Sequence, residues 1–224
     1  MKYKLTILLF IGICLKSIGQ VAVIEDKDGF TNVWLEPNSK SEIIYQIKTD
    51  QVFWFGEDHY DKNSEWTSVY IPKNNFSFDC TSPDYLKGFV HKSRIRPFNE
   101  KEEYTGTELT FEYVIKPFSD KNKIIDYQES KWIVAINGLK PWGTDGGKPN
   151  TEIKEIKVNL NGKEIIVPKV LTIDIYECDN KFDIYKIGKT YFVHQWNSDG
   201  AGAYEIVWVI TENGIKQRLV GTII

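Results

Sequence analysis

Short alternating runs of apolar residues, separated by turn-forming residues, constrain the fold of this chain more than any other sequence feature. Asn161-Gly162 is the clearest turn, because both central positions of a two-residue hairpin favour a positive φ that Asn and Gly adopt readily. The flanking runs Glu152–Leu160 and Lys163–Val167 are therefore predicted to pair as antiparallel strands. The first half of the chain shows no helical periodicity over a useful length. The sequence predicts an all-β fold.

Two further hairpins are predicted in the second half, around Gly188-Lys189 and around Glu212–Gly214. An alternating run at Leu109–Ile115 opens this half, and Leu171–Cys178 fits either a strand or a short helix. Consecutive hairpins indicate an antiparallel meander with one apolar face on a core. Residues 109–224 are predicted to be a C-terminal β domain, closed as a barrel or a sandwich.

The first half contains its own series of strands over residues 20–98. The predicted strands are Val21–Ile24, Phe30–Leu35, Ile43–Ile47, Gln51–Phe55, Trp66–Ile71 and Gly88–His91. The charged segment 99–108 has little to bury, and it is predicted to be a linker between two domains.

An ordered set of motifs links residues 21–98 to a known family. The motifs are Asp28-Gly29, Asn32-Val33, Pro37, Ile43-Ile44, Val52, Trp66–Val69 and Gly88–Ile95. This pattern resembles the bacterial SH3-like (SH3b) family. The resemblance implies a small barrel whose groove binds a peptidoglycan peptide or another extended peptide.

The chain departs from that family at three places. Trp34 stands where the family often has Arg, and Glu36 stands where it often has Gly. An insertion over Pro72–Lys87 replaces a tight turn, and loops of this length are often functional. In the second half, Pro141–Gly143, Ser198–Gly202 and the strand around Trp208 resemble modules of uncharacterised exported bacterial proteins; that resemblance implies no activity.

Aromatic residues are the predicted ligand-binding groups, since aromatic grooves bury a large ligand area at a low entropic cost. Trp66 and Phe89 are expected to belong to the core. The residues predicted to face a ligand or a partner are Trp34, Phe76, Phe78 and Tyr85.

The N-terminus reads as a cleaved signal peptide over residues 1–19. A basic start at Met1–Lys4 precedes the apolar run Leu5–Leu15, and Ser17–Gly19 supplies small residues before a cut at Gln20. The alternatives are a lipoprotein signal with Cys14 modified, or a buried N-terminal element. The mature chain is expected to be periplasmic or secreted, with no stable membrane span.

Charge and cysteine content exclude several classes of function. Removing the signal segment takes away three lysines and no acid, so the net charge falls from −3 to about −6. An acidic chain argues against nucleic-acid binding. Cys80 and Cys178 could pair in an oxidising compartment, but their separation does not require it. Two cysteines and three scattered histidines do not make a zinc site.

Two further hypotheses concern chemistry: a reactive thiol pair and a calcium site. Cys80 with His91 could form a thiol pair, although Cys80 lies in a polar insertion without an activating helix. Asp145 and Asp199 could hold Ca²⁺ if their Asp-Gly loops met in space, although tight turns explain both loops. We therefore expect no catalytic residue, metal or cofactor.

The sequence therefore predicts an exported, non-catalytic binding protein of the cell envelope, whose partner is a cell-wall peptide or a protein. The alternative is a secreted protein-interaction, inhibitor or immunity-type protein that acts through its C-terminal β domain.

Overall fold

The computed structural model describes residues 20–77, 85–197 and 200–222, which fold mainly into β-strands. Within these ranges, the helical elements are 3₁₀ turns of three or four residues. The predicted all-β fold is thereby confirmed. None of the helices in these ranges has the length and apolar character needed to cross a membrane. The predicted signal peptide, residues 1–19, lies outside the described residues.

Seven strands of the first half form one antiparallel sheet in the order β3-β2-β6-β5-β4-β1-β7. Successive side chains of a strand point to opposite faces, so each strand supplies one buried row. One face of the sheet closes over a cluster that includes Phe53, Phe55 and Val69. The strands are β1 (Val21–Ile24), β2 (Phe30–Trp34), β3 (Ile43–Lys48), β4 (Phe53–Phe55), β5 (Trp66–Pro72), β6 (Tyr85–His91) and β7 (Ile95–Pro97).

The second half contains a three-stranded sheet, a four-stranded sheet and a separate hairpin. Their orders are β12-β11-β8, β13-β14-β15-β16 and β10-β9. The strands are β8 (Leu109–Pro117), β9 (Ile125–Gln128), β10 (Trp132–Ile136), β11 (Thr151–Leu160), β12 (Lys163–Ile166), β13 (Asp183–Ile187), β14 (Thr190–Asn197), β15 (Tyr204–Thr211) and β16 (Gly214–Gly221).

The predicted hairpins form where the turn residues place them. Asn161 and Gly162 have φ values of 54° and 80°, and they join β11 to β12. The ambiguous segment 171–178 contains no named strand: the 3₁₀ turn η4 (Lys169–Thr172) leads into isolated bridges. β7 and β9 were not predicted, because both are short and rich in polar residues or Pro.

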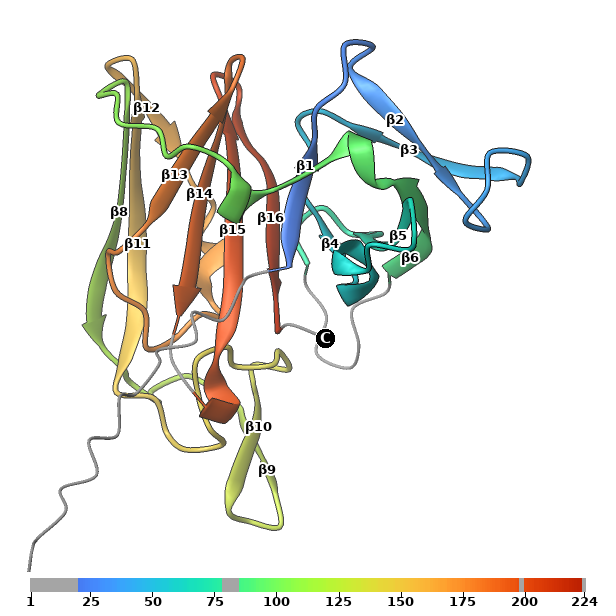
Figure 1. Ribbon diagram of the computed structural model, residues 1–224. Helices are drawn as coiled ribbons and strands as arrows, with labels where there is room; N and C mark the ends of the chain where they lie inside the picture. Colours follow the sequence, from blue (N-terminus) through green and yellow to red (C-terminus); the bar gives the residue numbers. More distant parts are fainter. Residues whose placement is uncertain (1–19, 78–84, 198–199, 223–224) are drawn as a thin grey trace, which may run out of the picture.

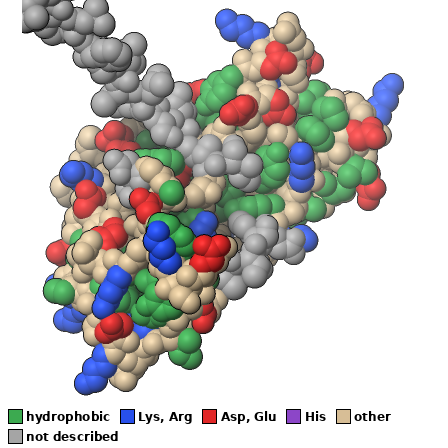
Figure 2. All heavy atoms as spheres, turned by 90° about the horizontal axis from the view of Figure 1, so that it is seen from below, with side chains coloured by type: hydrophobic (Ala, Val, Ile, Leu, Met, Phe, Trp, Pro, Cys, Tyr) green, Lys and Arg blue, Asp and Glu red, His purple; other side chains and the backbone are tan. Residues whose placement is uncertain are grey.

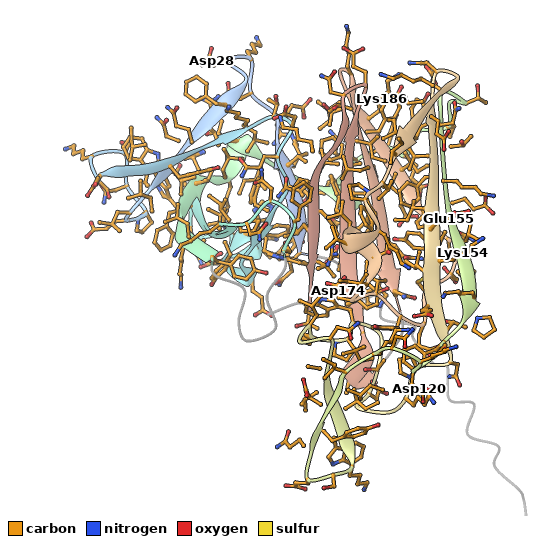
Figure 3. All side chains as sticks on the ribbon, turned by 180° about the vertical axis from the view of Figure 1, so that it is seen from behind. Asp28, Asp120, Lys154, Glu155, Asp174 and Lys186 are labelled. Carbon is orange, nitrogen blue, oxygen red and sulfur yellow. The ribbon has the colours of Figure 1, made fainter. Side chains whose placement is uncertain are left out.

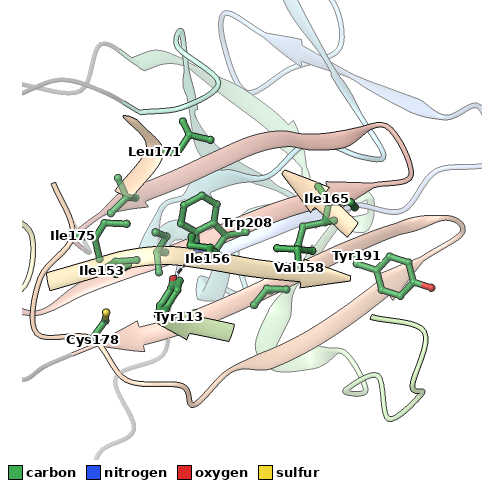
Figure 4. Close-up of a cluster of buried hydrophobic side chains, with 14 of the residues drawn as sticks. Tyr113, Ile153, Ile156, Val158, Ile165, Leu171, Ile175, Cys178, Tyr191 and Trp208 are labelled. Carbon is green, nitrogen blue, oxygen red and sulfur yellow. Dashed lines mark hydrogen bonds between the residues drawn. The ribbon is translucent and has the colours of Figure 1, made fainter. Parts of the chain in front are cut away.

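The two larger sheets of the second half pack face to face as a sandwich (Figure 4). Its centre holds Tyr113 from β8 and Trp208 from β15, and the Trp208 Nε1–H donates a hydrogen bond of 2.8 Å to the Tyr113 hydroxyl. That bond satisfies two polar atoms inside an apolar core. Ile153, Ile156 and Val158 of β11 lie in the same sheet as Tyr113 and face the sheet of Trp208 across the sandwich. The C-terminal sheets therefore form a sandwich rather than a closed barrel.

The four-stranded sheet is buried on both faces, because the first half of the chain covers its outer side (Figure 1). β15 shows this directly: Ile206 and Trp208 point into the sandwich, whereas Val207 and Val209 point toward the N-terminal sheet. We call this second set the interface cluster. Its members are Val21, Val23, Val52, Trp54, Phe98, Tyr185, Phe192, Val207, Val209 and Leu219. The protein is thus three layers deep at this point.

Polar bonds also join the two halves. The buried Gln217 side chain of β16 accepts from the Val52 N–H at 2.9 Å and donates to the Val52 carbonyl at 2.8 Å. The predicted linker 99–108 follows the second half closely, since the Tyr104 N–H donates to the Ile184 carbonyl at 2.7 Å. The Tyr104 ring also packs on Tyr191. The halves therefore share an apolar layer and backbone-directed hydrogen bonds.

Charged side chains of both signs are interspersed on the surface seen from below (Figure 2). Hydrophobic side chains lie between them on both halves of the molecule. This face therefore presents no broad field of a single sign.

Candidate functional site

A row of half-buried aromatic rings crosses the outer face of the N-terminal sheet. Trp34 of β2 meets Trp66 of β5 edge to face, with ring centroids 6.4 Å apart. His91 of β6 packs against the other side of Trp66 at 5.6 Å, and Phe89 pairs with Trp34 across the strands. All four residues are half-buried, and their outward direction follows from the strand period, because Val33 and Val90 point into the core. We call these four residues the aromatic strip.

A cavity of about 330 Å³ lies on the same face of the sheet. Trp54 and Tyr70 form its aromatic walls, and Glu57 and Asp58 supply two carboxyl groups. Ser68 also lines it, and this residue lies two positions after Trp66 on β5, on the same face of the sheet. We call this cavity the acidic pocket. Its size is at the lower end of the range for small-ligand sites.

Asp58 is held in place by the end of β5. Its carboxylate accepts hydrogen bonds from the Thr67 hydroxyl at 2.8 Å and from the Ser68 N–H at 2.9 Å. The 3₁₀ turn η1 (Glu57–Tyr60) is thereby fixed over the strand. Gly56 permits this approach, because a Cβ there would lie 2.2 Å from the Ser68 hydroxyl oxygen. The pocket is therefore preorganised by its own hydrogen bonds.

The structure separates the four residues predicted to bind a ligand. Trp34 lies in the aromatic strip, whereas half-buried Phe76 packs against the core of the C-terminal sandwich. Tyr85 packs against the interface cluster, and burial raises the pKa of its phenol to about 12. Phe78 lies outside the described residues. Phe76 and Tyr85 thus face the second half of the chain, and a ligand-binding role for these residues stays a prediction.

The sequence patterns did not indicate Trp54, Tyr70, Glu57 or Asp58 as site residues. A signal for Trp54 was present, because Phe53 and Phe55 flank it in one short strand. If both Phe side chains face the core, the strand period places Trp54 on the opposite face. The carboxylates had no comparable signal, since only folding brings η1 against β5.

The described residues give no support to the thiol-pair hypothesis or to the calcium-site hypothesis. Cys178 is buried as a free thiol, and burial raises its pKa to about 12, so it stays protonated. Cys80 and Asp199 lie outside the described residues. Asp145 does approach the other Asp-Gly loop, since its Oδ1 lies 2.6 Å from the position of a Cβ on Gly202. Across the described ranges, no group of three or more His, Cys, Asp or Glu side chains is arranged to hold a metal ion.

A second group of titratable side chains lies against the interface cluster. His194 Nε2 is 2.7 Å from Glu205 Oε1, and its Nδ1 is 3.5 Å from Asp183 Oδ2. Phe98 and Tyr185 pack on the imidazole. Burial alone would lower the pKa of His194, but hydrogen bonding and attraction to the two carboxylates outweigh burial and raise it to about 9. The arrangement resembles an acid–base triad, but the rings that cover it make it a structural ion cluster.

Because of this cluster, the protein is expected to lose stability as the pH becomes alkaline. The folded-state pKa of His194 is raised to about 9 from its ordinary value of 6.5. Its stabilising contribution is therefore complete below about pH 6.5 and is lost as the pH rises through about 9. We expect the free energy of unfolding to fall by at most about 3 kcal/mol across this window. Urea denaturation at pH 6 to 10 measures it.

A His194→Gln variant is the control for this pH dependence, because lysines and tyrosines also titrate near the upper end of the range. The variant is expected to be less stable at pH 6.5 and to have a flatter profile. Parallel profiles for the variant and the wild type would contradict a stabilising charge on His194.

A scan against protein-family models finds no match for this chain, and comparisons with curated proteins and with solved structures find none either. The fold defines the chain as an all-β protein with a C-terminal sandwich. The site adds an outer sheet face that carries aromatic rings and two carboxyl groups.

Proposed function

We propose that this protein is an exported, non-catalytic binding protein that holds an extended peptide on the outer face of its N-terminal sheet. The observation that carries the proposal is that the aromatic strip and the acidic pocket lie on one face of the sheet. Aromatic rings bury the ligand stem, and Glu57 and Asp58 attract an amino or basic group. The sequence resemblance to SH3-like domains favours a peptidoglycan peptide as the ligand, in the periplasm or outside the cell.

The strip is suited to an extended chain rather than to a compact small molecule. Its rings come from three adjacent strands, so they span the sheet across the strand direction. The acidic pocket lies on the same face beside η1, where one terminal group can enter. An extended peptide therefore contacts both features at once, with its apolar length on the rings and a cationic group in the pocket.

Retention on purified cell-wall sacculi tests this proposal. Truncation of a central aromatic in a binding site costs about 1–3 kcal/mol, so Trp34→Ala is expected to weaken retention by about tenfold or more. Trp132→Ala is the matched control, since Trp132 is an exposed tryptophan on β10, outside the strip. Its retention is expected to equal that of the wild type. A wild-type protein that sacculi do not retain would exclude the cell-wall ligand.

The second candidate function is a secreted protein-interaction or inhibitor role of the C-terminal half, and the β9–β10 hairpin favours it. This hairpin projects from the lower end of the molecule (Figure 1). Tyr127, Trp132 and Val134 on it are 54%, 43% and 44% exposed. Exposed apolar groups of this kind are typical of protein contacts. Under this alternative, Trp132→Ala abolishes capture of a protein partner and Trp34→Ala leaves it intact, which reverses the outcome of the sacculus experiment.

A further inference from the structure

Lys87 places a positive charge beside the acidic pocket. It stands on β6 directly opposite Tyr70 of β5, and residues paired in this way share one face of a sheet. Lys87 Nζ lies 5.3 Å from the centroid of the Tyr70 ring, which forms a wall of the pocket. Lys87 is exposed, and no carboxyl group of the described residues lies within ion-pair distance of its ammonium group. The pocket therefore contains carboxyl groups and has an available ammonium group next to its Tyr70 wall.

The negative side of the acidic pocket is fixed relative to the sheet. Asp58 Oδ1 accepts a hydrogen bond from the Ser68 hydroxyl at 3.1 Å, and Asp58 Oδ2 accepts one from the Ser68 N–H at 2.9 Å. Ser68 itself is buried. Glu57 precedes Asp58 on η1 and is exposed, so its side chain can turn toward a ligand. One carboxylate of the pocket is thus fixed, and the other is adjustable.

The geometry of the sheet sets the separation between the two signs of charge. Ser68 pairs with Phe89, and Lys87 lies two positions before Phe89, so Ser68 and Lys87 are diagonal neighbours on one face. Diagonal neighbours of this kind are about 7–8 Å apart. An ammonium and a carboxylate group on one carbon atom bridge about this distance when each forms a charge-assisted hydrogen bond of about 2.8 Å. The spacing favours such a zwitterion, because Lys87 repels a ligand that carries an ammonium group alone.

We infer that the acidic pocket and Lys87 together bind a free α-amino acid group of an extended peptide, at the end of the chain or of a side chain. The ammonium group lies on Glu57 and Asp58, and the carboxylate lies on Lys87. This inference rests on the proposed function, because it names the chemical class of the group that the same sheet face holds. Phe89 of the aromatic strip follows Lys87 by two positions on this face, so the rest of the peptide can lie on the rings.

Two peptides that differ in one group separate this inference from simple attraction of a cation. They are L-alanyl-γ-D-glutamyl-meso-diaminopimelate and L-alanyl-γ-D-glutamyl-L-lysine. The third side chain of both ends in an ammonium group, but only the diaminopimelate side chain has a carboxylate on the same carbon. In isothermal titration calorimetry, the diaminopimelate peptide is expected to bind at least about tenfold more tightly, because only this peptide engages Lys87.

The outcomes of this titration separate the inference from the proposed function. Equal affinities for the two peptides would overturn the inference and leave the proposed function standing. Binding of neither peptide would also overturn the inference, and the sacculus experiment then decides the proposed function by itself.

Three variants locate the zwitterion. Lys87→Gln is expected to lower the affinity for the diaminopimelate peptide to that for the lysine peptide, without weakening the lysine peptide. Glu57→Gln is expected to weaken both peptides, because both place an ammonium group in the pocket. Lys131→Gln is the matched control, since Lys131 is an exposed lysine of the second half that also lies over an aromatic ring, 4.3 Å from the centroid of Trp132. A preference for the diaminopimelate peptide that survives Lys87→Gln would overturn the site.

Salt dependence gives a second readout of the role of Lys87. Because the Lys87 side chain is exposed, its attraction to a carboxylate is screened by added salt. The preference for the diaminopimelate peptide is therefore expected to shrink between low and high sodium chloride. A preference that does not change with salt would overturn the role of Lys87.

Discussion

Replacing Arg218 with leucine is expected to lower the free energy of unfolding by about 3–5 kcal/mol. Arg218 of β16 is 0% exposed, and its guanidinium makes a two-point contact with Asp174, at 2.5 Å from Nη2 to Oδ2 and 2.9 Å from Nη1 to Oδ1. Nη1 also donates to the Leu171 carbonyl at 2.7 Å. Leucine fills much of the space but leaves Asp174 as a buried charge without its counterion, which is the costly outcome.

The geometry explains why this pair matters for the fold. Asp174 lies in the irregular segment after η4, inside the molecule rather than at its edge (Figure 3). The guanidinium therefore ties a segment without regular structure to the last strand of the chain. The backbone N–H of Arg218 also donates to the Asn75 carbonyl of the first half at 2.8 Å. One residue thus joins three parts of the chain that are distant in sequence.

Urea denaturation followed by tryptophan fluorescence measures the effect at neutral pH. The double variant Arg218→Leu/Asp174→Leu is expected to recover much of the loss, because removing both partners leaves no unpaired buried charge. Lys148→Gln is the matched control, since its ion pair with Asp120 is exposed and is expected to contribute little to stability. A loss for Arg218→Leu as small as that of the control would contradict the structural role of the buried pair.

Truncating Phe192 to alanine is expected to cost about 3–5 kcal/mol and to destabilise both halves of the chain together. Phe192 of β14 is fully buried in the interface cluster, with its ring centroid 5.7 Å from that of Phe98 in the first half. The cavity left by alanine lies between the layers, where Val207 and Val209 also pack. Because the two layers share this apolar contact, a void there weakens each of them.

Hydrogen exchange read by mass spectrometry tests this coupling, because peptides from the two halves report separately. We expect β1 and β4 to lose protection together with β14 and β15. Tyr127→Ala is the control, since Tyr127 is 54% exposed on β9 and its removal is expected to change stability by less than about 0.5 kcal/mol. If the N-terminal strands kept full protection in the Phe192 variant, the halves would be independent folding units.

Local patterns predicted the strands well, and they did so for a physical reason. Alternation along a strand and a positive φ at Asn161 and Gly162 are properties of neighbouring residues, which the sequence shows directly. The prediction lost precision where local signals conflict. The segment 171–178 is apolar enough for a strand, but distant residues fix its backbone in another conformation. The Arg218 guanidinium donates to the Leu171 carbonyl, and the Trp142 N–H donates to the Asp174 carbonyl.

The candidate site was predictable in part. Trp34 was selected because it replaces a polar residue of the SH3-like pattern, and it does lie on the outer sheet face with Trp66. Phe76 and Tyr85 were selected because they belong to a long insertion, but the described part of that insertion packs on the second half of the chain. Nothing in the local sequence distinguishes an aromatic residue that faces solvent from one that covers another layer.

The sequence by itself determined the class of fold, the positions of most strands and the turns that join them, since these depend on spacing and on backbone preferences. Only the tertiary structure decided which faces are covered. β15 reads as an ordinary half-buried strand, yet both of its faces are buried, because residues more than a hundred positions away close over Val207 and Val209. Arginine is usually exposed, but Arg218 is fully buried because the segment after η4 binds its guanidinium. Burial depends on which distant elements pack together, and the alternation of residues along a strand does not show this.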